Sequence, residues 1–164
     1  MAAAAEAPRG APVQAASPEY EGLVTRAIAF AIDALVIDLV AIVVAAVVAL
    51  VLSVISLPDN LDTVLLAAGG AAFLLWSAAY FVTFWSTTGQ TPGSRLLRIR
   101  VCRADDGAVL RPGRSLVRLV CLVLAAIPLF AGFLPVLVDD RRRGVHDMLA
   151  GTVVVGSEDA GSPA

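Results

Sequence analysis

One long uncharged stretch constrains this chain more than any other part of its sequence. Residues 39–57 contain no Asp, Glu, Lys or Arg. A helix over 34–57 would be about 36 Å long at a rise of about 1.5 Å per residue, which crosses a hydrocarbon core of about 30 Å with some tilt. Hydrophobic residues make up 59% of the chain, against about 45–50% in a soluble domain. The sequence therefore predicts an integral membrane protein.

A second apolar block predicts a second crossing of the membrane. We expect transmembrane helices over about 27–57 and 63–85, joined by a short turn. The second helix contains Gly69 and Gly70, and small side chains of this kind let another helix approach closely in lipid. It ends in aromatic residues, which are typical of a belt at the membrane interface: Trp76, Tyr80, Phe81, Phe84 and Trp85. We interpret both features as packing and anchoring rather than as a ligand site.

The placement of arginine predicts the orientation. The chain has 12 basic residues, all of them Arg. Seven lie within 86–118, whereas the turn at 58–62 has none. Because basic residues are enriched on the cytoplasmic side of a membrane protein, we expect the amino terminus and the region 86–115 to be cytoplasmic. The protein is then a multi-pass protein of the cell (cytoplasmic) membrane.

A third apolar block, within about 115–138, allows two arrangements. Pro128, Gly132 and Pro135 interrupt it, and each weakens a straight helix. A third span would place Arg141, Arg142 and Arg143 outside. A re-entrant helical hairpin would keep all 12 Arg inside, and it is the arrangement we favour. Such a break is tolerated at membrane depth only where protein or a water-filled cavity covers it.

Short β-prone segments flank this block. Apolar and basic residues alternate over 97–101, the period of a strand, and Asp106-Gly107 is a turn signal. We therefore expect a cytoplasmic β hairpin over about 95–111. Residues 151–155 form another β-prone run, which joins the same sheet only if it lies on the same side of the membrane.

The whole pattern defines a fold class and its boundaries. We predict an all-α membrane protein with two transmembrane helices, a re-entrant helical hairpin and a small cytoplasmic β element. The membrane domain covers 20–156. Residues 1–19 and 157–164 lack an apolar core, so we expect them to be disordered tails, the first of them cytoplasmic.

Two carboxylates in the first predicted span are candidate functional groups. A carboxylate within a membrane helix is expensive and marks a functional site by default. Asp33 and Asp38 are five residues apart, about 140° around a helix, so they do not form a pair. Arg26 and Asp33 share a face about 10 Å apart. Interfacial capping and ion pairing explain these residues as well as ligand or ion handling does.

Two further candidates follow the third block. The cluster Arg141, Arg142 and Arg143 is suited to bind anionic lipid at the membrane surface, or it acts only as a solvated topology signal. His146 and Asp147 come next, and a lone His beside an Asp is more often a local hydrogen-bonding feature than a proton relay.

Several kinds of chemistry find no support in the sequence. The segment Gly89–Ser94 lacks the spacing and the Lys of a phosphate-binding loop. We see no Cys/His metal cluster, no Ser-His-Asp order typical of a hydrolase and no pattern for binding nucleic acid. We therefore expect no metal, no cofactor and no nucleic-acid partner, and we do not expect an enzyme.

Three separated motifs resemble the RDD family of membrane proteins, named for one arginine and two aspartates. They are TRAIAFAIDALVID, GQTPGSRLLRIRV and RRRGVHDMLAGTVVV, in the order of the family, within about 22–155. The resemblance identifies Arg26 as the arginine of the name and Asp33 and Asp147 as the aspartates. By the topology above all three lie near the inner membrane interface, so we expect them to form one polar cluster at the cytoplasmic end of the helix bundle. Ser94 departs from the family, which commonly has Lys there. The family implies a multi-pass membrane protein, for which transport of an unidentified ligand has been suggested.

These observations leave three functional hypotheses. The first is transport of a small ion or solute by a homo-oligomer, because two spans alone do not easily enclose a path. The second is a non-transporting scaffold or accessory protein that binds lipid or a protein partner through its Arg-rich cytoplasmic face. The third, a membrane enzyme, is the weakest, because no pair of nucleophile and base is visible.

Overall fold

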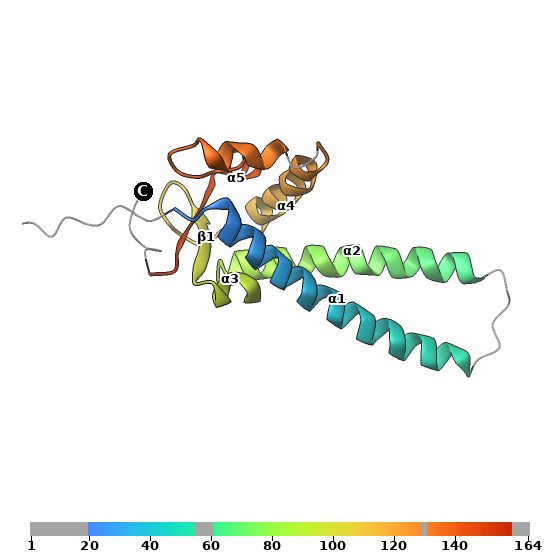
Figure 1. Ribbon diagram of the computed structural model, residues 1–164. Helices are drawn as coiled ribbons and strands as arrows, with labels where there is room; N and C mark the ends of the chain where they lie inside the picture. The colour runs from blue at the N-terminus through green and yellow to red at the C-terminus, as the bar shows by residue number, and fades with distance from the viewer. Residues whose placement is uncertain (1–19, 55–60, 129–130, 159–164) are drawn as a thin grey trace, which may run out of the picture.

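The computed structural model describes residues 20–54, 61–128 and 131–158. The predicted tail 1–19, residues 159–164 of the predicted tail 157–164, and most of the turn expected at 58–62 lie outside the described residues. Two long helices dominate the fold, α1 (Leu23–Ser53) and α2 (Asp62–Thr87). They lie close together where α1 begins and α2 ends, and they diverge toward their other ends (Figure 1). We call the first end, at Leu23 and Thr87, the base of the helix pair.

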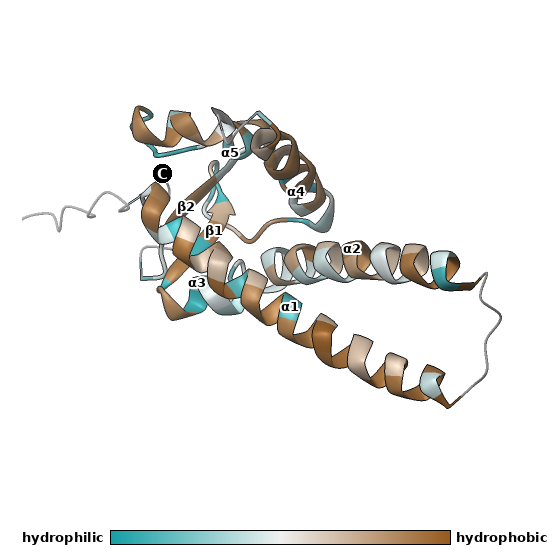
Figure 2. Ribbon diagram, turned by 45° about the vertical axis from the view of Figure 1, so that its right-hand side comes forward, coloured by the Kyte–Doolittle hydropathy of each residue, from teal (hydrophilic) through white to brown (hydrophobic). Residues whose placement is uncertain are grey.

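Both long helices have the surface of a membrane-spanning segment. Each is long and apolar enough to cross a membrane, and only 6% of its most apolar 18-residue window is buried inside the protein. Away from the base, α1 exposes apolar side chains in every direction, such as Ile42 at 64% and Leu50 at 69%, and this part is strongly hydrophobic (Figure 2). Apolar surface on this scale requires lipid or protein to cover it. The predicted all-α membrane fold with two spans is confirmed.

The remaining elements gather at the base. They are α3 (Pro92–Leu96), β1 (Ile99–Arg103), α4 (Pro112–Ala126), the 3-10 helix η2 (Ala131–Leu137), α5 (Val145–Ala150) and β2 (Thr152–Gly156). Thr91 begins α3 by accepting a hydrogen bond from the backbone N–H of Ser94, and Pro92 at the first helical position has no N–H to satisfy. Gly151 ends α5 with φ +61°, a left-handed conformation that glycine adopts without strain.

The small sheet pairs two segments that are far apart in the sequence. Strands β1 and β2 are antiparallel, with Ile99 opposite Gly156 and Arg103 opposite Thr152. Tyr20 also bridges to Val155. One face of the sheet packs against α1 and α2 in the main hydrophobic core, which contains Ala29, Trp85, Ile99, Val101, Leu110 and Val154. The start of the domain and both strands therefore lie on the same side of the helix pair.

The predicted hairpin over 95–111 is wrong in its second strand. β1 pairs with β2, whereas residues 108–110 form no strand. The reason lies in the next residue pair: Arg111 caps α4 and Pro112 begins it, and Pro has no N–H to donate to a sheet. Leu110 enters the core, where it is 2% exposed. Ser157, which we placed in the tail, still donates its backbone N–H to Arg98 at 2.7 Å.

The third apolar block is not one helix. It consists of α4 and, after a break, η2, which contains Pro135. The two pack closely because Gly132 has no side chain: a Cβ there would lie 2.4 Å from the Cβ of Ala125. The chain enters this block after β1 and leaves it before β2, so it starts and ends at the base.

Candidate functional site

Three buried charges, Arg26, Arg118 and Asp147, form a network at the base. Arg26 of α1 donates from Nη1 to Asp147 Oδ2 of α5 at 2.6 Å. Arg118 of α4 donates to the other carboxylate oxygen, Oδ1, and also to Thr152 Oγ1 of β2 at 2.5 Å. Asp147 is 0% exposed, Arg118 1% and Arg26 5%. One carboxylate therefore joins the first long helix to α4, α5 and the sheet.

Two features hold these charges in place. Gly144 donates its backbone N–H to Asp147 Oδ2 at 3.2 Å, which fixes the carboxylate in the first turn of α5. The guanidinium of Arg118 also lies over the ring of Trp85, 5.1 Å from its centroid, a favourable cation–π position. Burial of a charge is strongly unfavourable unless it is paired in this manner.

The network determines the protonation of its members. Burial disfavours the charged form of Asp147, but the guanidinium groups of Arg118 and Arg26 outweigh it and hold the pKa at about 2. Burial lowers the pKa of His146 to about 4, although the Asp147 carboxylate acts in the opposite direction. At neutral pH Asp147 is therefore ionised and His146 is neutral.

Asp33 has a separate set of partners. Its Oδ1 accepts from the Tyr80 hydroxyl at 2.8 Å and from the backbone N–H of Gly93 at 2.7 Å. Its Oδ2 accepts from the Thr91 hydroxyl at 2.5 Å. Asp33 is 1% exposed, so it links α1 to α2 and to the start of α3 in a protected site.

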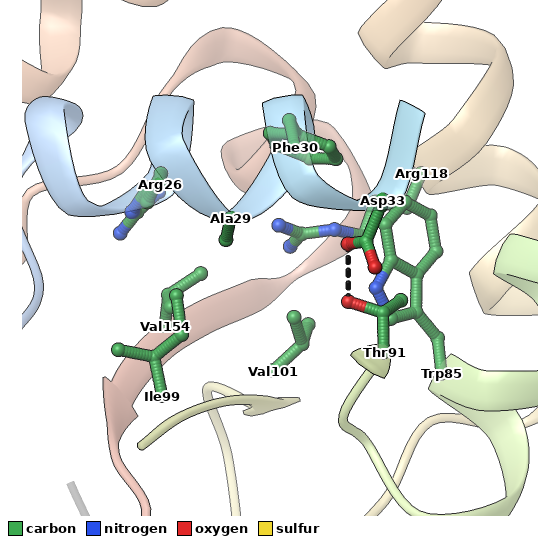
Figure 3. A pocket seen from close by; sticks show the side chains of 10 residues that line it. All are labelled: Arg26, Ala29, Phe30, Asp33, Trp85, Thr91, Ile99, Val101, Arg118 and Val154. Carbon is green, nitrogen blue, oxygen red and sulfur yellow. Dashed lines mark hydrogen bonds between the residues drawn. The ribbon is translucent and has the colours of Figure 1, made fainter. Parts of the chain in front are cut away.

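A small cavity lies between the two groups of charges. Its volume is about 30 Å³, and its wall includes Arg26, Asp33, Thr91 and Arg118. Figure 3 shows the Arg118 guanidinium extending between Ala29 and Asp33. Among the described residues, Arg26 Nη2 and Arg118 Nε have no hydrogen-bond partner. The cavity has room for a water molecule, which could satisfy such a donor.

The structure therefore brings some of the predicted residues together and separates others. Arg26 and Asp147 are in direct contact. Asp33 binds neither, although it shares the cavity wall with Arg26. Asp38 lies on the exposed side of α1, away from this site. His146 is 1% exposed, with Nε2 3.5 Å from Asp147 Oδ2 and its ring tilted against the ring of Phe133, 4.9 Å between centroids.

The basic cluster after the third block is organised by a carboxylate of its own. Arg143 makes two contacts with Asp139, both at 3.0 Å. Side-chain and backbone hydrogen bonds from Arg143 lower the pKa of Asp139 to about 2. Arg142 is exposed with φ +48°, and a Cβ on Gly22 would lie 3.3 Å from its Nη1. Its guanidinium therefore lies against the start of α1.

Sequence reasoning missed the residues that complete the site. Arg118 lies in an apolar block, and we counted it only as a topology signal. The signal for its burial is its place on α4, on the side of the helix opposite an apolar face that is exposed at the protein surface. That face consists of Leu116, Val117, Val120, Val123, Leu124 and Ile127. Tyr80 and Trp85 were interpreted as an interfacial belt, but both turn inward, to Asp33 and Arg118. Thr91 carried no signal beyond its role as a helix cap.

The described residues contain no group of three or more His, Cys, Asp or Glu that could hold a metal ion. Both cysteines are free, with Cys102 buried and Cys121 half-buried.

The fold and the site define a helical membrane protein with a charge network at the base of its helix pair. The RDD family matches residues 20–151, and the chain belongs to this family. It is 34% identical over 91 residues to the "Proline-rich antigen homolog" of two strains of Mycobacterium tuberculosis, covering 56% of this chain and 37% of the relative. It is 33% identical over 87 residues to the "Uncharacterized protein RP437" of Rickettsia prowazekii, covering 53% of this chain and 48% of the relative. The chain thus spans less than half the length of these relatives. No solved structure matches it.

Proposed function

We propose that this chain is a non-enzymatic, multi-pass protein of the cell membrane that carries a small ion or solute as a homo-oligomer. The observation that carries the proposal is the set of buried ionisable side chains at the base: Arg26, Asp33 and Arg118 line one small cavity, and Asp147 is bound to both arginines. An ionisable group buried within a membrane helix, such as Asp33 of α1, is a candidate for an ion or substrate pathway.

The proposed orientation places the base on the cytoplasmic side. Of the 12 Arg in the chain, those on described residues belong to the first turn of α1 or to the segments between α2 and α5. The pairing of β1 with β2 supports this topology, because a segment that starts and ends at the base crosses the membrane an even number of times. We therefore propose that α4 and η2 enter the bilayer from the cytoplasmic side without crossing it.

The shape of the helix pair supports the oligomer in this proposal. α1 and α2 diverge away from the base (Figure 1), so one chain does not enclose a path. A Cβ on Gly69 or Gly70 would meet nothing within 4 Å among the described residues, which leaves this part of α2 open to a helix from another subunit.

A second candidate function is supported by a different observation. The outward face of α4 is apolar, and the carboxylates of Asp33 and Asp147 already have full sets of donors. An apolar outer face and internally satisfied carboxylates are sufficient for a protein that binds lipid or a membrane partner and transports nothing. Flux, and its dependence on charge, distinguishes the two functions.

Asp33→Asn is the variant that tests transport. Asn keeps the oxygen that accepts from Tyr80 and Gly93, and its amide faces Thr91. The Thr91 hydroxyl can then accept from the amide and donate to Ser94 Oγ, 2.9 Å away. The substitution therefore removes the charge and retains the hydrogen bonds.

The experiment is reconstitution in liposomes with pH and cation readouts. The proposal expects flux from the native protein and its loss in Asp33→Asn at equal folded yield. The matched control is Asp38→Asn, which removes an exposed carboxylate from the same helix and should retain flux. Absence of flux from the native protein under ion and pH gradients, together with retention of one defined partner on purification, would replace transport by the second function.

A further inference from the structure

A groove of about 620 Å³ lies at the base. One wall is a single face of α1, formed by Leu23, Arg26, Ala27, Phe30 and Ala34. The other walls come from α2, α4, η2 and α5, with Phe81, Leu122, Phe133 and His146 among them. A volume of this size falls within the range of about 300–1,000 Å³ for sites that bind small molecules.

The polarity of the groove changes along its length. From Leu23 to Ala34 it follows α1 for about 16 Å at about 1.5 Å per residue. Its two polar members, Arg26 and His146, both contact Asp147. Because Arg26 is in the first turn of α1, the polar part of the groove lies toward the start of that helix. Toward Ala34 its wall is apolar, and the same helix continues into its lipid-exposed part. The groove is therefore polar at the base and apolar in the direction of the bilayer.

Positive charge gathers at the polar end. The first turn of α1 contains no acidic residue, and Gly22 gives it no side-chain cap, so its free N–H groups and the helix dipole favour an anion. The Arg142 guanidinium lies against Gly22. Independently, Arg26 is 5% exposed, forms part of the groove wall, and its Nη2 has no hydrogen-bond partner among the described residues.

We propose that this groove binds an anionic phospholipid of the surrounding bilayer, with the phosphate at the start of α1 beside Arg142 and one acyl chain along Ala27, Phe30 and Ala34. The direction of the groove carries the assignment. A lipid whose headgroup lies at the base has its chains directed into the membrane, which is the order of charge and apolar surface found here. A protein segment would not require this order.

The inference does not depend on transport, and it names a site and a lipid class for the lipid binding of the second candidate function. It requires only that the base lies at a membrane surface. Ala27 is exposed and lines the groove, so Ala27→Trp should fill it without disturbing the core. Ile28→Trp is the matched control, because Ile28 is exposed on the same helix but is not part of the groove wall.

A second pair of variants tests the headgroup. Arg142 and Arg98 are both exposed and both have positive φ, 48° and 55°. Asn tolerates this conformation better than most residues, so Arg142→Asn and Arg98→Asn remove the same charge at similar backbone cost. Of the two, Arg142 is the one whose guanidinium lies against Gly22, next in the chain to the groove residue Leu23.

The measurement is native mass spectrometry of the full chain in mild detergent, with phosphatidylglycerol or phosphatidylcholine added. We expect the native protein and Ile28→Trp to retain phosphatidylglycerol in preference to phosphatidylcholine, and Ala27→Trp to lose it. Arg142→Asn should lower the preference about fivefold, the effect of about one basic residue at a membrane surface, whereas Arg98→Asn should not. Equal retention of both lipids by the native protein, or an unchanged preference in Arg142→Asn, overturns the proposal even if Ala27→Trp fails to fold.

Discussion

Arg26 and Asp147 are 121 positions apart in the sequence, yet the guanidinium of one donates to the carboxylate of the other at 2.6 Å. This ion pair joins the first turn of the first long helix to the last helix of the domain. Arg118 binds the second oxygen of the same carboxylate. The position of α1 relative to the small sheet therefore depends on a charge that has no access to water.

Removal of Arg26 tests how much this pair stabilises the protein. Arg26→Ala should lower the free energy of unfolding by about 3–5 kcal/mol, because it leaves a buried carboxylate with one of its cationic partners missing. The measurement is the midpoint of unfolding in detergent, with folded yield by gel filtration. Arg103→Ala removes a partly exposed ion pair with Asp106 and should have a much smaller effect, because water and salt screen exposed ion pairs. Equal effects of the two changes would contradict the structural importance of the buried pair.

The close approach of α3 to α1 depends on Gly93. A Cβ there would lie 2.2 Å from the Ala29 carbonyl oxygen and 2.9 Å from Asp33 Oδ1, so Gly93→Ala must separate the two helices. We expect a loss of about 1–3 kcal/mol, typical of overpacking.

Gly113→Ala is the matched control, because among the described residues nothing lies within 4 Å of a Cβ at that position. It should leave the unfolding midpoint unchanged or raise it slightly. A stable Gly93→Ala protein would show that α3 does not pack on α1 as described.

Acid should destabilise the protein in two steps. The chain has a single His, and its pKa in the folded state is about 4 against an ordinary 6.5. Between these values the unfolded chain binds a proton that the folded chain does not, so stability falls as the pH is lowered from 6.5 to 4. The pKa of Asp147 is about 2 against 3.8, so its contribution is complete above 3.8 and is lost toward pH 2.

Thermal unfolding in detergent across pH 7 to 4.5 measures the first step. His146→Leu should flatten this dependence, because Leu is apolar, fits a buried position and does not titrate. If the native protein and His146→Leu lose stability equally over this range, the burial of neutral His146 is not the cause.

Self-association should depend on the glycines of α2. Gly70→Leu adds a large side chain where the described residues leave open space, so the fold of one chain should be unaffected. A partner helix would no longer approach closely, and the dissociation constant of the oligomer should increase. Fluorescence energy transfer between labelled chains in bilayers, compared with the unfolding midpoint in detergent, separates the two effects. An unchanged oligomer would remove this surface of α2 from the proposed assembly.

The membrane helices could be predicted from the sequence because their signal is local. Length and absence of charge define α1 and α2 without reference to any other segment. The broken third block was also visible, since Pro128 and Pro135 mark the break within a short range. The choice of β2 as the partner of β1 was left open, because pairing between segments about 50 residues apart has no local signature.

The charge network was only partly predictable for the same reason. The family resemblance selected Arg26, Asp33 and Asp147, but it did not indicate which of them are in contact. Their similar predicted depth at the inner membrane interface suggested one cluster of three. The structure divides it, because Tyr80, Thr91 and Gly93 satisfy Asp33, and Arg118 takes its place beside Asp147. Arg118 is part of the site because the side of α4 that carries it is buried. Which side of α4 is buried depends on tertiary packing.

Cysteine accessibility in intact cells tests the central claim of this account, that the charge network and the sheet lie on the cytoplasmic side of two membrane spans. Cys102 and Cys121 are first replaced by Ala, and single cysteines are introduced for Asp62, Asp105 and Arg142. A membrane-impermeant thiol reagent should label the Asp62 position in intact cells, and the Asp105 and Arg142 positions only after permeabilisation. Labelling of the Asp105 or Arg142 position in intact cells would contradict the account.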